Sequence, residues 1–383
     1  MQSGQPDVLI VGAGVVGAAC ALALAREGVR VLVIDADFVG GGSTAAAMGH
    51  LVVMDDSEPE FQLTAYSRRL WAELSDELPP DCEDERRGTL WVASAPEEMD
   101  AVREKGERYT SRGIAAEVVD ERTLAEMEPH LRRGLAGALH VPDDCVLYPP
   151  AAARYLATRA RELGVEVRER CTAESVKGTT VRIRERGGSA YSVSAGAVVN
   201  AAGVDAPRLT PGLPIIPRKG HLLITDRYPG LCGCQIVELG YLHSAHTLGG
   251  ASVAFNVQPR ATGQLLIGSS RELVGREAEV NRDLLRSMLQ RAIEFMPVLA
   301  HCNATRAWTG FRPATPDALP LIGRWDGADG VWIAAGHEGL GITMAPGTGA
   351  LIADAILGRE PALDITPFAP GRAMPAPAEP AGL

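Results

Sequence analysis

The stretch Val8-Leu9-Ile10-Val11-Gly12-Ala13-Gly14-Val15-Val16-Gly17 decides the fold. An apolar strand enters a Gly-x-Gly-x-x-Gly turn, an Ala/Leu-rich helix follows to about residue 27, and residues 31–34 form a second apolar strand. Gly12 permits the tight turn, Gly14 lets a pyrophosphate approach the backbone, and Gly17 lets the helix pack closely on the strand. The pattern predicts a dinucleotide-binding βαβ unit with the pyrophosphate at the positive end of the helix.

Asp35 ends the second strand of this unit. A carboxylate at that position accepts hydrogen bonds from ribose hydroxyls and repels a 2′-phosphate, which disfavours NADP. FAD and NAD share this mode of binding, so the fingerprint alone leaves both open.

The composition restricts the partners. The chain has 383 residues, with 37 Lys and Arg against 48 Asp and Glu, a net charge of −11. This balance argues against nucleic acid or an anionic membrane surface as a partner. An acidic protein that binds an anionic substrate needs a locally placed cation. The length is sufficient for two domains.

The seven cysteines are scattered, without the spacing of a disulfide-rich secreted domain or of a metal cluster. We therefore expect a cytoplasmic protein with no bound metal. The N-terminus has no basic segment ahead of its apolar stretch, and no run reaches the roughly 18 apolar residues of a membrane span. We expect no transmembrane segment.

Strands that run into small-residue turns occur near residues 8, 197 and 331, which predicts one doubly wound sheet. The strand-rich region after Pro214, followed by a helix over about 281–295, predicts a second, mixed sheet. The expected fold class is α/β (α+β), a Rossmann-like dinucleotide-binding domain with an inserted mixed-sheet substrate domain. The expected boundaries are 1–82, 143–212 and 305–370 for the first domain, 83–142 and 213–304 for the second, and a disordered Pro/Ala-rich tail over 371–383.

The order of five motifs resembles the FAD-dependent D-amino-acid oxidase family, which includes glycine and sarcosine oxidases and flavin subunits of bacterial amino-acid dehydrogenases. The motifs are the βαβ fingerprint with Asp35, the small-residue run 43–49, the turn 199–203, the block 308–323 and the turn 336–343. Together they cover residues 8 to about 357. The resemblance implies the glycine oxidase-like fold and FAD as the cofactor.

The resemblance also implies which residues contact FAD. A helix that starts near residues 339–343 would direct its N–H groups at the flavin edge that becomes negative on reduction. The expected cofactor-binding residues are Gly12, Gly14, Val15, Val16, Asp35, Ala36, Ser43, Thr44, Ala47, Gly49, His50, Val176, Ala201, Gly203, Arg312, Gly336, His337, Gly339, Leu340, Gly341, Ile342 and Thr343.

Arg312 resembles the carboxylate-binding arginine of the family, and its planar fork fits a carboxylate bidentately. The alternative is a surface arginine before a proline. His50, His337 and Tyr241 are further catalytic candidates. Each histidine could instead be structural, and Tyr241 could either close over the substrate or be an ordinary strand tyrosine. The implied reaction is hydride transfer from the substrate Cα–H to flavin N5, which gives an imine and requires no strong base.

Residues 48–57, Met-Gly-His-Leu-Val-Val-Met-Asp-Asp-Ser, resemble enzymes for D-hydroxyproline and related cyclic imino acids. The expected reaction is oxidation of cis-4-hydroxy-D-proline or D-proline to a Δ1-pyrroline-2-carboxylate. The alternatives are a glycine, sarcosine or other D-amino-acid oxidase, and the flavin subunit of a heteromeric proline or opine dehydrogenase. An NAD-linked dehydrogenase is a third hypothesis, and it predicts no bound yellow chromophore. The electron acceptor, whether oxygen, a quinone or a partner subunit, stays open.

We expect FAD to be bound non-covalently. Family members with a histidine-linked flavin carry that histidine where Ala46 stands here, and the cysteine used by sarcosine oxidases has no counterpart in residues 337–343. Acid precipitation should leave the yellow colour in the supernatant, measured by its visible absorption. A yellow pellet would contradict the prediction.

Overall fold

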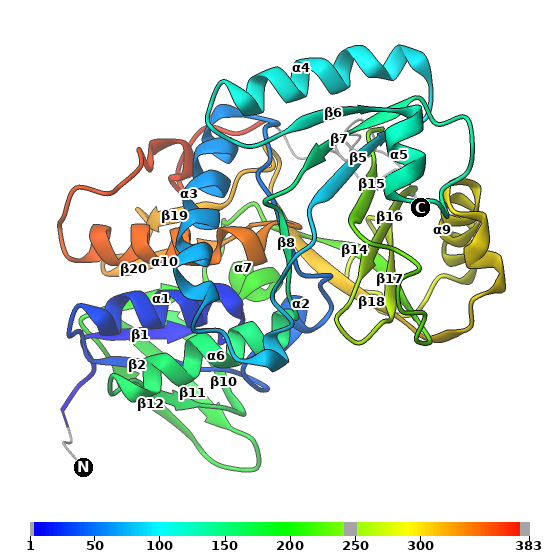
Figure 1. Ribbon diagram of the computed structural model, residues 1–383. Coiled ribbons are helices and arrows are strands. Elements are labelled where there is room, and N and C mark those ends of the chain that lie inside the picture. The colour runs from blue at the N-terminus through cyan, green and yellow to red at the C-terminus, as the bar shows by residue number, and fades with distance from the viewer. Residues whose placement is uncertain (1–3, 241–250, 376–383) are drawn as a thin grey trace.

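The computed structural model describes residues 4–240 and 251–375 (Figure 1). Its first sheet has the strand order β19-β20-β13-β1-β2-β9, parallel except for β19 at one edge. The units predicted near residues 8, 197 and 331 are the neighbouring strands β1, β13 and β20. The strands of this sheet are β1 (Val8–Val11), β2 (Val31–Ile34), β9 (Glu166–Arg168), β13 (Ala197–Asn200), β19 (Leu321–Arg324) and β20 (Val331–Ala335).

Alternate residues of β1 face two different layers, because successive side chains of a strand point to opposite faces. Val8 and Ile10 pack in the core formed with α1 (Val15–Arg26), α6 (Pro149–Glu162) and α10 (Gly341–Ile356). Leu9 and Val11 pack against a three-stranded antiparallel sheet on the other face. This sheet consists of β10 (Cys171–Lys177), β11 (Thr180–Glu185) and β12 (Ala190–Ser194).

The second large sheet has eight strands in the order β18-β14-β17-β16-β15-β5-β7-β6. In Figure 1, α9 (Arg282–Phe295) and α4 (Met99–Thr110) lie beside different parts of this sheet. The strands are β5 (Thr89–Ala93), β6 (Glu117–Asp120), β7 (Gly137–Val141), β14 (Ile216–Thr225), β15 (Gln235–Glu238), β16 (Ser252–Pro259), β17 (Leu265–Arg271) and β18 (Ala304–Ala314).

One predicted boundary differs from the structure. The sequence pattern assigns residues from 305 onward to the dinucleotide domain, but β18 pairs antiparallel with β14 from Ile216↔Ala314 to Thr225↔Ala304. This long ladder pairs the inner edge of β18 with the second sheet. The chain therefore returns to the first sheet only after residue 314.

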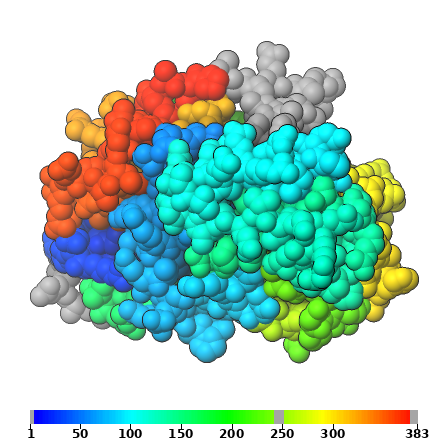
Figure 2. Space-filling model, turned by 45° about the horizontal axis from the view of Figure 1, so that its top comes forward, coloured from blue at the N-terminus to red at the C-terminus, as the bar shows by residue number. Residues whose placement is uncertain are grey.

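The shorter elements complete the connections. Strands β3, β8 and β4 form a small sheet in the order β3-β8-β4. Figures 1 and 2 show the blue N-terminal and orange-to-red C-terminal segments side by side at one end of the molecule. These elements are α2 (Gly42–Ala45), β3 (His50–Leu51), α3 (Glu58–Ser75), β4 (Glu85–Arg86), α5 (Glu121–Met127), β8 (Cys145–Val146) and α7 (Ala206–Leu209).

The C-terminal segment is anchored further than expected. Arg372, inside the tail expected to be disordered, donates to both carboxylate oxygens of Asp317, at 2.7 and 2.8 Å. Residues 376–383 lie outside the described residues. Within the described ranges, no helix is both long and apolar enough to cross a membrane.

Helix α3 supplies a hydrogen bond that α10 lacks. Pro346 lies inside α10 and has no N–H to donate to the carbonyl of Ile342, four residues earlier. The indole Nε1 of the buried Trp71 donates to that carbonyl instead, at 2.9 Å. The packing of α3 on α10 thus repairs the backbone of the helix that begins at the small-residue turn.

We expect Trp71→Phe to lower the free energy of unfolding by about 2 kcal/mol, because it leaves a buried carbonyl unpaired and removes packing. Urea unfolding measures the change. In a Pro346→Ala background the restored N–H can pair with Ile342, so the same substitution should cost about 1 kcal/mol less. An equal loss of unfolding free energy in the two backgrounds would show that Trp71 does not compensate for the missing N–H of Pro346.

Candidate active site

One cavity of about 510 Å³ passes between the two large sheets. It begins at the turn between β1 and α1, continues along residues 41–50 and the turn after β20, and ends against the second sheet. Parallel strands end at a common edge, so the turns after β1, β13 and β20 contribute to the same wall. The cavity therefore connects the turn after β1 with the second sheet.

The first end of the cavity has the features required for a dinucleotide. Gly12 has a φ of +109°, and a Cβ there would overlap the carbonyl of Ala201 after β13. Asp35 accepts from the N–H of Ala13 at 2.7 Å and from the N–H of Asp37 at 2.8 Å. Burial raises the pKa of the Asp35 carboxyl. The N-cap residue of α1, Gly14, has no side chain that could cap the helix, which suits an anionic pyrophosphate.

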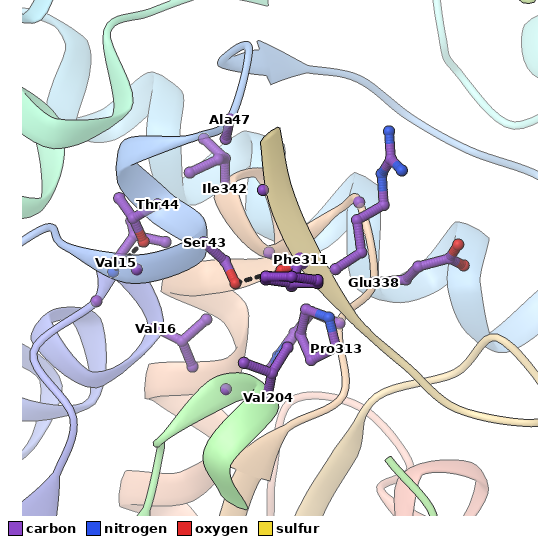
Figure 3. Close-up of a pocket in the computed structure, with 18 of the residues that line it drawn as sticks. Val15, Val16, Ser43, Thr44, Ala47, Val204, Phe311, Pro313, Glu338 and Ile342 are labelled. Atoms are coloured by element: carbon purple, nitrogen blue, oxygen red, sulfur yellow. Dashed lines mark hydrogen bonds between the residues drawn. The ribbon is translucent and has the colours of Figure 1, made fainter. Parts of the chain in front are cut away.

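The small-residue run forms the middle of the wall. Ser43 Oγ donates to the carbonyl of Phe311 at 2.5 Å, and the N–H of Val15 donates to Thr44 Oγ1 at 3.1 Å (Figure 3). These bonds tie α2 to β18 on one side and to α1 on the other. Small side chains at Ala46 and Ala47 line the cavity between these contacts, as a flat ring system requires.

Helix α10 begins at the other side of the cavity. It has no side-chain cap, and its first residues, Gly341 and Ile342, line the wall together with Gly339 and Leu340. The uncapped N-terminus carries partial positive charge. This arrangement fits the flavin edge that accumulates negative charge, as the sequence predicts.

His50 and His337 line the cavity as neutral groups; His337 is buried and His50 is half-buried. His50 Nε2 lies 2.8 Å from Thr89 Oγ1, and His337 Nε2 lies 2.9 Å from Thr348 Oγ1. Burial lowers the pKa of each imidazole to about 3. Neither imidazole carries a charge at neutral pH, and each has one ring nitrogen engaged by a threonine. This geometry favours a structural role for both histidines over a role in proton transfer.

Charged side chains gather where the cavity meets the second sheet. Arg312 Nη1 donates to the carbonyl of Ser270 at 3.0 Å. Glu338 Oε1 accepts from Arg218 Nη1 at 2.6 Å, and the N–H of Glu338 donates to Pro313. Arg312 and Glu338 are therefore both held by neighbouring strands at the cavity wall.

Most residues predicted to contact FAD lie in the wall, and a few do not. Val176 packs beside two hydrophobic clusters, and β10 reaches the cavity through Cys171 and Ala173 instead. Gly336 and Thr343 lie behind the wall; Thr343 Oγ1 donates to the carbonyl of His50 at 3.0 Å. Tyr241 lies outside the described residues. The predicted residues in the wall are Gly12, Gly14, Val15, Val16, Asp35, Ala36, Ser43, Thr44, Ala47, Gly49, His50, Ala201, Gly203, Arg312, His337, Gly339, Leu340, Gly341 and Ile342.

Several wall residues were not predicted. The available signal was a charged or amide side chain inside an apolar strand, as at Asn256 and Arg271, which are both buried. The polar wall residues that the sequence did not predict are Asp37, Asp56, Glu60, Asp205, Arg208, Asn256, Ser269, Arg271 and Glu338. In the part of the chain that the structure describes, no three His, Cys, Asp or Glu side chains are placed to hold a metal ion.

The family described as FAD dependent oxidoreductase (DAO) matches residues 7–355. The chain belongs to this family. FAD is therefore its cofactor, and the fingerprint, the small-residue run and the α10 N-terminus described above are the parts that fit it. The open choice between FAD and NAD is thereby settled, and the protein is an FAD-dependent oxidoreductase.

Full-length relatives of this DAO protein include glycine oxidase of Geobacillus kaustophilus, 29% identical over 94% of this chain and 96% of the relative. An opine oxidase subunit of Rhizobium meliloti is 26% identical over 96% of this chain and 98% of that relative. The crystal structure of the Geobacillus glycine oxidase matches with a TM-score of 0.86 at 28% identity, over 97% of this chain and 100% of that chain. The fold is that of glycine oxidase, as the resemblance implied.

The His337 pKa gives a pH prediction. The unfolded imidazole titrates near 6.5 and the folded one near 3, so protons bind the unfolded chain preferentially and stability falls as the pH drops below 6.5. From pH 7 to pH 5 this group should remove about 2 kcal/mol from the free energy of unfolding.

His337→Gln should therefore lose about 2 kcal/mol less than the natural protein over that range, measured by urea unfolding at each pH. His130→Gln, at an exposed histidine, is the matched control. An unchanged pH dependence in His337→Gln would show that His337 is not held neutral.

Proposed function

We propose that the protein oxidises the Cα–N bond of a small amino or imino acid to an imine, and that Arg312 binds the substrate's carboxylate. The observation that carries this proposal is the position of Arg312. It lies in the cavity wall, and its Cδ and Nε would be 3.8 Å from a Cβ on Gly339, in the turn before α10. A guanidinium there can hold a carboxylate bidentately beside the flavin-binding turn.

The remaining groups at this end include apolar side chains that suit the carbon skeleton of an amino or imino acid. Bound FAD supplies the acceptor for the Cα hydride, so the side chains need only to bind and orient the substrate and to exclude water. The neutral His50 and His337 are consistent with chemistry that uses no strong base. Apolar wall residues near the second sheet are Met48, Val52, Met54, Leu222 and Val237.

Two substrate groups follow from this site. The names of the glycine oxidase relatives support glycine. The sequence 48–57 supports cis-4-hydroxy-D-proline or D-proline, and Met48, Val52 and Met54 of that stretch lie in the cavity wall. The relatives give the first group the stronger support.

A second proposal concerns the electron acceptor. Two relatives that align over nearly their whole length are named as subunits, one of hydrogen cyanide synthase (HcnC) and one of opine oxidase. This supports a role as the flavin subunit of a heteromeric dehydrogenase. Purified alone with substrate, such a protein should reduce an artificial dye and form little hydrogen peroxide. Stoichiometric peroxide would instead support an oxidase.

Anaerobic mixing with glycine, sarcosine, D-alanine, D-proline and cis-4-hydroxy-D-proline should bleach the flavin absorption with at least one compound. Arg312→Ala should raise the concentration for half-bleaching about 100-fold, since it removes charge-assisted hydrogen bonds to the carboxylate. Arg324→Ala, at an exposed arginine of β19, is the control. No bleaching by any compound, or an unaffected Arg312→Ala variant, would overturn the proposal.

A further inference from the structure

The side chain of Arg312 crosses a neighbouring strand. β14 lies between β18 and β17, and Gly220 of β14 is in register with Gly310 of β18. A Cβ on Gly220 would lie 2.5 Å from Nη1, 2.8 Å from Nη2 and 2.9 Å from Cζ of Arg312. These distances are far shorter than van der Waals contact. The guanidinium therefore occupies the space that any side chain at position 220 would need.

The backbone conformation at position 220 does not require glycine. The φ of Gly220 is not among the positive values that favour glycine over other residues. Alanine can adopt the same backbone conformation, so the glycine is explained by space: it leaves room for the guanidinium, and it also lines the cavity.

The far end of the guanidinium is held by β17. Arg312 Nη1 donates to the carbonyl of Ser270 at 3.0 Å, and the Ser270 side chain is itself fixed from β14. Ser270 Oγ accepts from the N–H of His221 at 2.9 Å and lies 2.8 Å from His221 Nδ1. Both residues are fully buried.

The tautomer of His221 follows from its other nitrogen. His221 Nε2 accepts from the N–H of Asn281 at 3.0 Å, ahead of α9. The ring proton is therefore on Nδ1, which donates to Ser270 Oγ. Burial lowers the pKa of the imidazole, in agreement with a neutral ring.

We propose that Gly220, Ser270 and His221 form a preorganised seat for the Arg312 guanidinium, with Gly220 as a positioning residue for carboxylate binding. This inference rests on the proposed role of Arg312. A free arginine side chain loses rotamer entropy when it is fixed. A guanidinium already fixed across β14 avoids most of that loss when a carboxylate binds.

The test uses the FAD-loaded enzyme and acetate as a carboxylate probe that cannot be oxidised. Acetate binding is followed by the change in the visible flavin spectrum. We expect Gly220→Ala to weaken acetate binding at least ten-fold and to raise the substrate KM more than it lowers kcat. Ser270→Ala keeps the backbone carbonyl that accepts from Arg312 but removes the hydroxyl that bonds to His221, and should weaken acetate binding about three-fold.

A double-substitution cycle separates the seat from a general packing defect. Gly220→Ala should lower the melting temperature of the natural protein but not that of Arg312→Ala, where the colliding guanidinium is absent. A Gly220→Ala protein that fails to fold, with Gly220→Ala/Arg312→Ala folded, supports the seat. Unchanged acetate binding in Gly220→Ala, equal melting losses in both backgrounds, or failure of both proteins to fold would overturn it.

The two proposals fail separately. Acetate binding that depends on both Gly220 and Arg312, together with no bleaching by any amino acid, would retain the seat and reject amino-acid oxidation. Bleaching that depends on Arg312 but is unchanged in Gly220→Ala would retain amino-acid oxidation and reject the seat.

Discussion

The structure depends on the close contact between the turn after β1 and the end of β13. The turn at Gly12 lies so close to the carbonyl of Ala201 that no side chain would fit between them. β1 and β13 therefore end at the same level. β20 pairs on the other side of β13, and its turn leads into α10. Two helix N-termini, those of α1 and α10, are thereby brought to one cavity, and in neither does the N-cap residue supply a side-chain hydrogen bond.

The substrate end depends on a different constraint, which is the length of β18. This strand starts in the second sheet and ends at Ala314, beside the first domain. Its residue Phe311 receives the hydrogen bond from Ser43, and the next residue, Arg312, lies across β14. One strand thus fixes both the small-residue run expected to contact the flavin and the arginine expected to contact the substrate.

Local sequence predicted the first of these constraints well and the second poorly. The glycines and apolar runs near residues 8, 197 and 331 have short-range causes, a tight turn and a fully buried strand, so they are legible in the sequence. The pairing of β18 with β14 is a contact between segments about ninety positions apart, and a local pattern does not encode it. The same limit applies to Gly220, whose role appears only when Arg312 is placed above it.

The wall residues show the same division. Asp35 follows its strand directly and was predicted, whereas Glu338 is held at the cavity by an ion pair with Arg218, 120 positions away. Val176 was expected from resemblance to a family position, but β10 has a register shift between Ala173 and Ser175. A shift of this kind changes which residues of a strand face a given surface. Cys171 and Ala173 line the cavity instead.

The most direct measurement is a crystal structure of the FAD-loaded enzyme with a bound, non-oxidisable carboxylate. The account predicts carboxylate oxygens about 2.7–3.0 Å from the guanidinium nitrogens of Arg312, with that guanidinium still across Gly220. A carboxylate bound elsewhere in the cavity, with Arg312 making no contact to it, would contradict the assignment of the substrate site.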